Sequence, residues 1–394
     1  MPERPVICYV RLAYFTQEAR ALRHLRFLGE HFDFICIGYG DDPSPLLPGV
    51  KIEWHPIQQA WGKKWLKIIR TLARWPGRII PPFDWLPDWM MADWRAAKRI
   101  IAGLNYDLFM GSDMSPLLLA VWQQKAKGRP FIMDYHEYAP LEAEEKRWHR
   151  WFHGPHSWRL LRRYGGLARG SSVVNEQFAE RMIREFNIPA ITVMNAPELI
   201  ELPVRVRPED GLIHLAFHGH PGGDRNLDAL LRAMPLLDDR FVLHLMLMSG
   251  MEQGSEWRRL AAEAPAGRVV FEDTVTPRQT VGRLVQWDIG FNILEPLNYN
   301  HRHALPNKFF DYIHAGLATV CSDTVTGRDF AERYGIGWVV ETITPESLAS
   351  LLLSLTPEDI AAKKQAALRL REQIHARSEE SKLVAMVSRA LAAA

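Results

Sequence analysis

The sequence has few cysteines, no long apolar run and no apparent export signal. Its three cysteines, Cys8, Cys36 and Cys321, lie far apart in a chain of 394 residues and form no Cys-x-x-Cys pair. This spacing argues against a disulfide framework and against a structural zinc site. No uncharged apolar run reaches about 18 residues, and the N-terminus lacks the apolar segment of a signal peptide. We therefore expect a cytoplasmic protein without a membrane-spanning helix.

The chain also lacks a strong net charge. It carries 48 Lys and Arg against 46 Asp and Glu, a formal charge of +2. A nearly neutral chain is not a general polyanion binder, so we expect no nucleic-acid partner, and any charge effect must be local. No Asp-x-Asp motif occurs, which argues against a divalent cation that clamps substrate phosphates. We therefore expect no metal and no cofactor.

What the sequence does have is an alternation of short apolar runs with segments of helical periodicity. Residues 6–10 and 131–133 are typical of the runs, and the alternation predicts β-α-β units with a parallel sheet covered on both faces. Proline-rich breaks at 195–210 indicate a linker, after which the alternation restarts. We predict an α/β protein with two Rossmann-like, doubly wound domains facing a central cleft. The predicted domains are residues 1–200 and 208–375, with a C-terminal helix at about 376–394 that packs back on the first.

A glycine-rich loop follows the predicted strand at 214–217. Gly219 and Gly222 let the backbone approach an anion closely, and a helix is expected to begin near Asn226. Free N–H groups at that helix start, together with the guanidinium of Arg225, suit a phosphate. The alternative is an ordinary glycine-rich turn between a strand and a helix.

A second candidate site lies at residues 304–312. A polar, irregular stretch that begins at Glu295 leads into a helix expected to start at about Asn307. Lys308 falls in the first turn, where a lysine opposes the helix dipole unless an anion is present. Asp311 follows on nearly the same face and could accept both hydroxyls of a ribose. The alternative is a simple surface pair between Lys308 and Asp311.

These two segments resemble the retaining glycosyltransferases of the GT-B fold, in the large family 4-like group that includes bacterial surface-glycan enzymes. The resemblance lies in residues 306–316, Pro-Asn-Lys-Phe-Phe-Asp-Tyr-Ile-His-Ala-Gly, and in Gly219 and Arg225 of the earlier loop. It implies transfer of a sugar from a nucleotide-diphosphate donor, UDP- or GDP-linked, to a glycan or lipid-linked acceptor. Retention of configuration and a role in bacterial polysaccharide or glycoconjugate synthesis are implied as well.

The resemblance also implies roles for individual residues. Arg225 and Lys308 would neutralise the donor phosphates and Asp311 would hold the ribose. Fixed cations aimed at the departing nucleoside diphosphate are the expected catalytic device, because negative charge grows there in the transition state. The predicted donor-binding residues are Gly219, His220, Gly222, Arg225, Glu295, His303, Leu305, Pro306, Asn307, Lys308 and Asp311.

Two histidines depart from the family pattern. His220 stands where the family usually has arginine, and His303 where it often has a glutamate that contacts the donor sugar; Glu295 could substitute for that glutamate. The spacings His218-x-His220 and His301-x-His303 could suggest a metal, but no third ligand matches them. A histidine that faces a diphosphate could instead be protonated and serve as a cation.

In the first half, polar residues follow predicted strands. His136 lies in Asp134-Tyr-His136-Glu137, where the resembling family has Asp-x-His-Asp/Glu with the histidine near the transferred sugar. We therefore predict a catalytic role for His136, the alternative being a hydrogen-bonded loop histidine. Further acceptor-side candidates are Arg11, Asp113, Asp134 and Glu137.

Two segments combine tryptophan with basic residues, at 61–75 and 146–164. In the first, Trp61 and Trp65 share a helical face with isoleucine and leucine, and Lys63 lies on another face. A basic amphipathic helix with tryptophans is a candidate for contact with an anionic membrane surface. The alternative is a solvated helix packed on its own domain.

Two other functions fit the same motifs. A sugar-nucleotide epimerase or hydrolase could use this fold and donor site without an acceptor. A non-catalytic member could bind a nucleotide sugar, or only a partner protein, without turnover. Binding of nucleotide sugars, followed by product analysis, distinguishes these alternatives.

Overall fold

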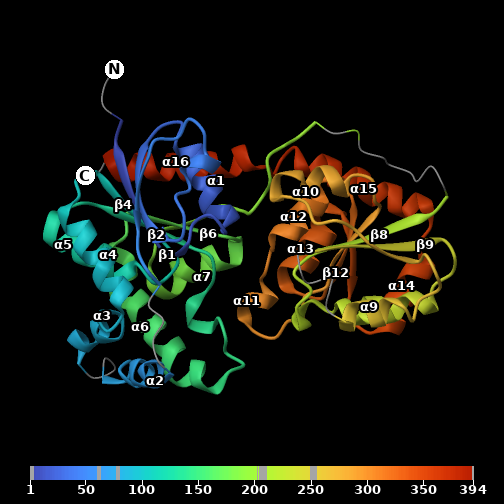
Figure 1. Cartoon of the computed structure of the whole chain (residues 1–394), viewed down its shortest axis with the longest axis horizontal. Coiled ribbons are helices and arrows are strands. Elements are labelled where there is room, and N and C mark those ends of the chain that lie inside the picture. Colours follow the sequence, from blue (N-terminus) through green and yellow to red (C-terminus); the bar gives the residue numbers. More distant parts are fainter. Residues whose placement is uncertain are drawn as a thin grey trace. The chain divides into compact units, whose positions relative to one another are not determined.

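The computed structural model describes residues 4–59, 64–76, 80–201, 203, 211–248 and 255–392. Trp61, Lys63 and the predicted linker residues 208–210 lie outside the described residues, as do the side chains of Trp65 and Lys67. The contacts divide the chain into two compact units, shown in Figure 1. The N-terminal unit contains Met1–Met194, Asn298–Asn300 and Arg377–Ala394, and the C-terminal unit contains Asn195–Leu297 and His301–Ala376.

The N-terminal unit is built on a seven-stranded parallel sheet with the order β3-β2-β1-β4-β5-β6-β7. Its strands are β1 (Val6–Tyr14), β2 (Asp33–Tyr39), β3 (Ile52–Pro56), β4 (Leu108–Ser112), β5 (Phe131–Tyr135), β6 (Gly170–Val173) and β7 (Ala190–Thr192). Its helices are α1 (Ala19–Leu28), α2 (Lys64–Leu72), α3 (Leu86–Trp89), α4 (Ala92–Gly103), α5 (Leu117–Lys127), α6 (Gly154–Tyr164), α7 (Glu176–Phe186) and α16 (Ala376–Ala392).

Strand β1 explains why the apolar runs of this unit are continuous rather than alternating. Ile7 and Tyr9 pack into the core on one face of the sheet, whereas Cys8 and Val10 pack into the core on the other. Successive side chains of a strand point to opposite faces, so a strand covered on both sides must be apolar at every position. The described cysteines are all free and buried.

The C-terminal unit repeats this plan with a six-stranded parallel sheet of order β10-β9-β8-β11-β12-β13. In β8, Leu215 and Phe217 face one core and Ala216 faces the other. Its strands are β8 (Ile213–Gly219), β9 (Phe241–Leu247), β10 (Val269–Phe271), β11 (Ile289–Asn292), β12 (Ala318–Ser322) and β13 (Gly337–Val340). Its helices are α8 (Leu227–Ala233), α9 (Ser255–Ala261), α10 (Pro277–Leu284), α12 (Asn307–His314), α13 (Val325–Tyr334), α14 (Pro345–Ser354) and α15 (Pro357–Arg371).

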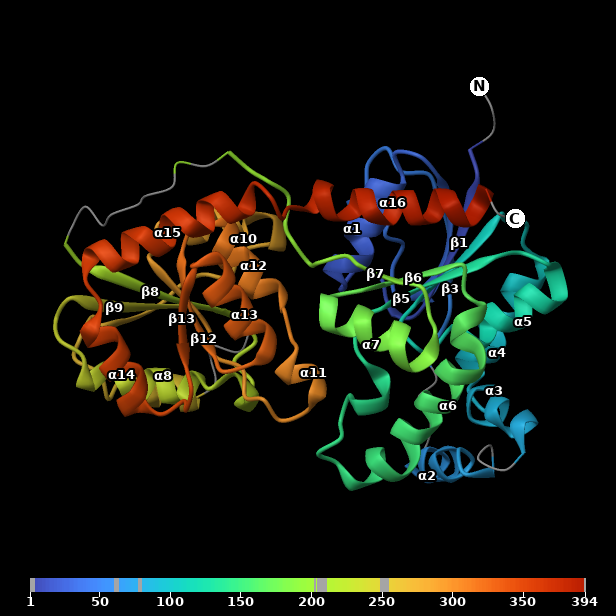
Figure 2. The same ribbon diagram turned by 180° about the vertical axis from the view of Figure 1, so that it is seen from behind.

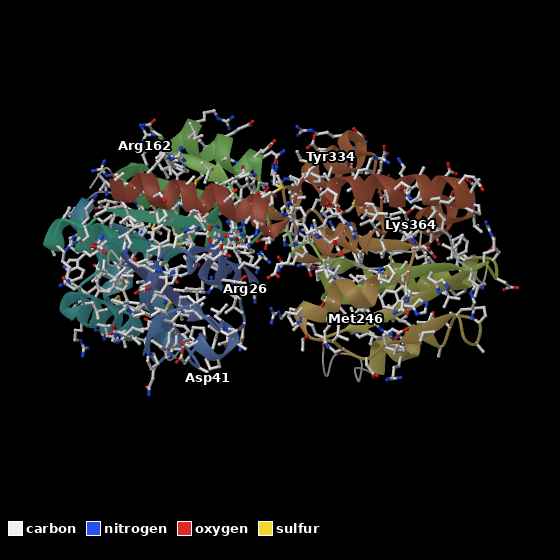
Figure 3. The ribbon with its side chains drawn as sticks, turned by 90° about the horizontal axis from the view of Figure 1, so that it is seen from above. Arg26, Asp41, Arg162, Met246, Tyr334 and Lys364 are labelled. Carbon is white, nitrogen blue, oxygen red and sulfur yellow. The ribbon has the colours of Figure 1, made fainter. Side chains whose placement is uncertain are left out.

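A buried ion pair fastens α15 to this second sheet. Lys364 projects from α15 and donates to the Asp288 carboxylate at 2.7 Å and to the Trp287 carbonyl oxygen at 2.9 Å (Figure 3). Asp288 in turn accepts from the backbone N–H of His214 at 2.9 Å. The lysine therefore links the helix to the start of both β8 and β11.

Two segments from the second half of the sequence belong to the N-terminal unit. Helix α16 buries Leu383 and Val387 against the core that also contains Leu25 of α1, and Figures 1 and 2 both show α16 beside α1. The first residues of the short helix α11 (Tyr299–Arg302) are the other segment. The ring of Tyr299 lies 5.2 Å from that of Tyr138, between centroids.

The order of strands locates the edge at which a ligand is expected in each unit. The direction of winding reverses between β1 and β4 in the first sheet and between β8 and β11 in the second. In open parallel sheets, ligands bind beyond the carboxyl ends of the strands at such a reversal. The two parallel sheets confirm the predicted pair of Rossmann-like domains. Within the described residues, no helix is both long enough and apolar enough to cross a bilayer.

Candidate functional site

The loop after β8 folds back toward the end of β11. Gly219 ends the strand at φ +93°, a left-handed conformation that favours glycine. Asn226 also has a positive φ, of 49°, and its side-chain amide donates to the Ile293 carbonyl oxygen at 3.0 Å. The backbone N–H of Glu295 donates to the Asp224 carbonyl oxygen at 2.8 Å. These bonds bring the predicted glycine-rich loop to the reversal point of the second sheet.

The start of α12 lies at the same edge. Pro306 precedes the helix, and no side chain among the described residues caps its first turn. Buried Leu305 anchors the entry, and the Thr326 hydroxyl donates to the Ala304 carbonyl oxygen at 3.0 Å. The Nζ of Lys308 lies 4.2 Å from the ring centroid of Phe217, the residue two before the end of β8. The helix start, with its free N–H groups, therefore adjoins the β8 loop.

Lys308 is held in an electrostatically unfavourable position. Burial, and then the positive charge of Arg225, lower the pKa of Lys308 to about 7, although Asp224 acts in the opposite direction. In the described part of the chain, no carboxylate lies within ion-pair distance of Lys308. Arg225 itself lies 3.6 Å from the Asp224 carboxylate, a loose pair between neighbours. Two cations beside a helix N-terminus with so little compensation are an arrangement that suits an anion.

Asp311 lies one turn along α12 from Lys308. One of its carboxylate oxygens is 3.5 Å from Nε2 of His218, which lies in β8. Burial, followed by the charge of Lys308, lowers the pKa of His218 to about 3, so this imidazole is neutral. His218 therefore cannot supply the cationic histidine considered from the sequence. The spacing that put Asp311 and Lys308 near one helical face is present in α12.

The remaining donor-side candidates are polar side chains that are exposed or half-buried. The His220 side chain is exposed, and its Nδ1 accepts from the Gly222 N–H at 2.9 Å, closing its own turn. Glu295 and Asn307 are exposed, and His303 is half-buried. No group of three or more His, Cys, Asp or Glu among the described residues could hold a metal ion.

At the carboxyl edge of the first sheet, Arg11 follows the regular part of β1. Its guanidinium donates to the Ser112 hydroxyl at 2.9 Å and forms ion pairs with Asp113 at 3.2 Å and Glu18 at 3.0 Å. Asp113 comes directly after β4 and has a φ of +67°, which is uncommon for a residue other than glycine. Arg11 thus lies at the reversal point of its sheet, with its charge fully compensated.

Asp134, near the end of β5, is completely buried and has three hydrogen-bond partners, with His24 3.6 Å away. Arg20 pairs with it at 2.7 Å, the Ser172 hydroxyl donates to it at 2.6 Å, and Nε2 of His136 lies at 2.9 Å. Burial raises the pKa of Asp134, but Arg20 and the two nearby histidines outweigh burial and hold it well below its usual value. Burial likewise lowers the pKa of His136, and Asp113 and Asp134 reverse this so that it is raised. Asp113 and Asp134 therefore stabilise the protonated form of His136 at the edge of the sheet.

Glu137, the last acceptor-side candidate, is exposed. The side-chain amide of Asn300 donates to its carboxylate at 3.2 Å, and the same side chain accepts from the Tyr138 N–H at 3.0 Å. Asn300 lies in the polar stretch after β11 that the sequence assigned to the donor loop. The structure instead places residues 298–300 in the N-terminal unit.

The sequence did not reveal Arg20, His24 and Glu380 as part of this cluster. Arg20 and His24 lie one turn apart on the buried face of α1, and Glu380 comes from α16, 3.6 Å from His24. Burial raises the pKa of Glu380 to about 8. Arg20 occupies a position of α1 that faces the core, and a charged residue at such a position could have indicated a buried ion pair. No local signal linked α16 to α1.

A separate open hollow of about 720 Å³ lies along the edge strand β7 of the N-terminal unit. Arg169 and Arg389 line it together with Ile183 and Met386. None of the candidate catalytic or binding residues borders it, so it is not part of either carboxyl edge.

Comparison with known proteins gives a family match and a set of similar folds. Residues 19–195 match the model of Glycosyltransferase Family 4. No curated protein sequence matches the chain at a significant level. A glycosyltransferase from Rickettsia africae is similar in structure, with a TM-score of 0.69, 10% identity, and coverage of 98% of this chain and 99% of that one.

Two further structures have the same fold. Anabaena HepE, solved with UDP and glucose, has a TM-score of 0.63 and 11% identity, over 98% of this chain and 100% of HepE. The N-terminal domain of Candida albicans trehalose-6-phosphate phosphatase has a TM-score of 0.62 and 11% identity, over 98% and 97%. At these identities the likeness establishes the fold, and the role of each residue must come from its own surroundings.

Proposed function

We propose that the chain, which has the GT-B fold, is a glycosyltransferase of the family 4-like group that takes its sugar from a nucleotide-diphosphate donor held by the C-terminal unit. The observation that carries this proposal is Lys308, a half-buried cation at the start of α12 without a carboxylate partner among the described residues. A diphosphate supplies the charge that Lys308 and Arg225 lack. The UDP and glucose in the structure of HepE support a UDP-linked donor, with GDP as the other candidate.

In the proposed reaction, the bond from the sugar to the diphosphate breaks and a bond to an acceptor oxygen forms. Lys308 and Arg225 stabilise the leaving diphosphate as its charge grows, and the N–H groups at the start of α12 assist them. The acceptor hydroxyl gives its proton to the leaving diphosphate oxygen as the new bond forms, so that the nucleoside diphosphate departs with that proton. Asp311 accepts from the ribose hydroxyls, and transfer proceeds with retention and without metal or cofactor.

We assign the acceptor to the N-terminal unit. His136, held by Asp134 and carrying a raised pKa, contacts the transferred sugar, and its imidazolium offers a hydrogen bond to a sugar hydroxyl. Arg11, Asp113 and Glu137 are the acceptor-side polar groups at this edge. The acceptor is a glycan or lipid-linked intermediate of bacterial polysaccharide or glycoconjugate synthesis, and the enzyme works in the cytoplasm, peripherally on the inner face of the membrane.

Thermal unfolding with UDP-, GDP- and dTDP-sugars tests the donor assignment. A donor at about 100 times its Kd should stabilise the folded protein by about 2.7 kcal/mol, which raises the melting temperature by several degrees. Inorganic phosphate at equal concentration is the control for a non-specific anion effect. If no nucleotide sugar raises the melting temperature beyond that control, the donor site is wrong.

A second function on this fold is a sugar-nucleotide epimerase or hydrolase, which would act without an acceptor. Product analysis after incubation with the stabilising donor alone distinguishes the two activities. A transferase leaves nearly all of the donor intact until a glycan acceptor is added. Rapid, complete conversion without acceptor would favour the epimerase or hydrolase.

A further inference from the structure

One face of the N-terminal unit exposes tryptophans and cations together. We define the basic–aromatic face as residues 64–75, 80–89 and 146–164, which include α2, the turn η3 (Pro81–Trp85), α3, the π-helical turn η5 (His149–His153) and α6. Figures 1 and 2 both show α2, α3 and α6 gathered at one end of this unit. The three stretches therefore lie together and form one surface.

Hydrogen bonds and ion pairs hold these stretches together. Arg159 of α6 donates to the Arg74 carbonyl oxygen at 2.8 Å, and Nη1 of Arg74 lies 3.1 Å from Nε2 of His153. Asp84 of η3 is fully buried beneath Arg163, its hydrogen-bond partner, and Arg159, 3.5 Å away. Polar contacts between the three stretches thus hold the surface together, and several of its large apolar side chains are exposed to solvent.

Large apolar side chains of this face are open to solvent to an unusual degree. The exposed fractions are 61% for Ile68, 54% for Trp75, 56% for Trp89 and 62% for Trp151. Across the described residues, all the exposed tryptophans belong to this face. Isolated exposed apolar residues are ordinary, but a contiguous aromatic group marks a surface that another phase or molecule covers.

The charge of the face has one sign. Residues 64–75 contain four Lys or Arg and residues 146–164 contain six, and neither stretch contains Asp or Glu. Of the two acids in residues 80–89, Asp84 is buried and Asp88 is half-buried, where burial raises its pKa to about 6. Neither acid thus lies open on the surface, and the exposed Arg147, Arg150 and Arg162 make it positive, whereas Arg74 is buried.

We propose that this face binds the interface of a bilayer that contains anionic phospholipid. Tryptophan rings suit the headgroup level, and basic residues beside them attract anionic headgroups. Guanidinium groups already lie over the indoles: Arg162 is 5.0 Å from the ring centroid of Trp158 and Arg95 is 5.6 Å from that of Trp89.

A shallow hollow of about 390 Å³ opens within the same face. Phe83, Trp85, Trp89 and Trp94 line it, and Lys98 closes one side. Its walls are mostly apolar, so it provides a recess for part of a lipid chain between the indole rings. This surface lies wholly within the N-terminal unit and does not depend on the donor assignment.

Co-sedimentation with vesicles tests the proposal on the full chain. We expect binding to vesicles of three parts phosphatidylcholine and one part phosphatidylglycerol to exceed binding to pure phosphatidylcholine by at least about tenfold, because each surface cation gains free energy near anionic lipid. Salt should reverse the gain as it shortens the range of the attraction. Equal, weak binding to both vesicles would overturn the proposal and leave a protein partner as the occupant.

Matched variants locate the binding face. The pair Ile68→Ser and Ile69→Ser should lower vesicle affinity several-fold, and so should the pair Arg150→Gln and Arg162→Gln, since all four side chains are exposed on the face. The controls are Ile183→Ser and Arg184→Gln on α7 of the same unit, where both side chains are also exposed. Controls that reduce binding as much as the face variants would contradict the assignment.

Stabilisation by UDP-glucose separates a membrane defect from a donor defect. The face variants should keep the wild-type melting temperature and the wild-type shift with UDP-glucose while they lose vesicle binding. Failure of UDP-glucose to stabilise any form would count against the donor site alone. Loss of vesicle binding only together with a lowered melting temperature would indicate misfolding and count against the face.

Discussion

The carboxyl edges of the two sheets carry opposite electrostatic arrangements. At the first, each cation has its anion: Arg11 pairs with Glu18 and Asp113, and Arg20 pairs with buried Asp134. At the second, Lys308 adjoins Arg225, and burial lowers its pKa to about 7. The same sheet geometry therefore serves two purposes. The compensated edge fixes the position of a histidine, and the uncompensated edge is the one at which we propose that a ligand supplies the missing negative charge.

Backbone conformation shows a parallel between these edges. A non-glycine residue with positive φ occurs at each, Asp113 after β4 and Asn226 after the β8 loop. Both side chains are used: Asp113 pairs with Arg11, and Asn226 donates to the end of β11. Unusual backbone conformations tend to persist at functional sites because the surrounding contacts stabilise them. The predictions below test the contrast between the edges.

Removing the charge of Asp134 should have the largest effect. Asp134→Asn leaves Arg20 buried without its partner, and breaking a buried ion pair costs about 3–5 kcal/mol. Urea unfolding measures the loss. The matched control is Asp33→Asn, whose partner Lys51 is exposed and whose pair is worth at most about 1 kcal/mol. Equal losses for both variants would mean that the first edge is not specially compensated.

Lys308→Ala should weaken donor binding or turnover by tens-fold or more, since a hydrogen bond to a charged phosphate contributes about 1.5–3 kcal/mol. Calorimetry with UDP-glucose and steady-state kinetics measure the change. Lys125→Ala, on the exposed side of α5, is the control and should bind as wild type does. Wild-type kinetics for Lys308→Ala would remove this residue from the site.

The pH dependence of donor binding distinguishes the two edges further. An anion favours protonated Lys308, whose pKa of about 7 in the free protein means that the proton is present below pH 7 and lost above it. Affinity for UDP-glucose should therefore be full below pH 7 and fall above it, by up to about tenfold per pH unit. The sugar-linked diphosphate does not titrate in this range, so the change reports the protein.

Lys308→Arg is the control for this pH dependence, because a guanidinium stays charged throughout. Its affinity for UDP-glucose should change by no more than about twofold between pH 6 and pH 8. An equally steep fall in the arginine variant would assign the titration to another group.

The smallest expected effect is that of chelation. If Lys308 and Arg225 neutralise the diphosphate, EDTA should leave the transfer rate within about twofold of its starting value, in contrast to an enzyme whose metal performs that role. The measurement is the rate before and after EDTA, with magnesium or manganese then added in excess. Activity that EDTA abolishes and either metal restores would contradict the metal-free proposal.

The fold could be predicted because parallel sheets leave a strong local signal. Buried strands carry short apolar runs, such as residues 131–133 at the start of β5, and proline marks the start of α12 at Asn307. The strand order was not predictable in this way, since pairing of β1 with β4 depends on contacts across about a hundred residues. The reversal point, and with it the meeting of the β8 loop with α12, required the structure.

The sequence indicated Lys308 and Asp311 as candidates, and their roles stay predictions until a ligand is tested. It could not indicate how Lys308 is supported, because the ring of Phe217 lies in another strand. His220 shows the limit of matching a motif: it occupies a position where the family usually has arginine, yet its imidazole closes a local turn. The buried cluster of Arg20, Asp134 and Glu380 draws on three distant segments, so no single motif could contain it.

Helix α16 has a consequence for how the protein acquires its structure during synthesis. Leu383, Met386 and Val387 complete a core whose other members include Ile7 and Leu25, so the ribosome delivers one part of that core long before the other. The whole C-terminal unit emerges in between. Until α16 is released, the nascent first sheet has one face open at the place that this helix will cover. Chaperone contact and proteolysis of the unfinished chain should therefore concentrate on that face.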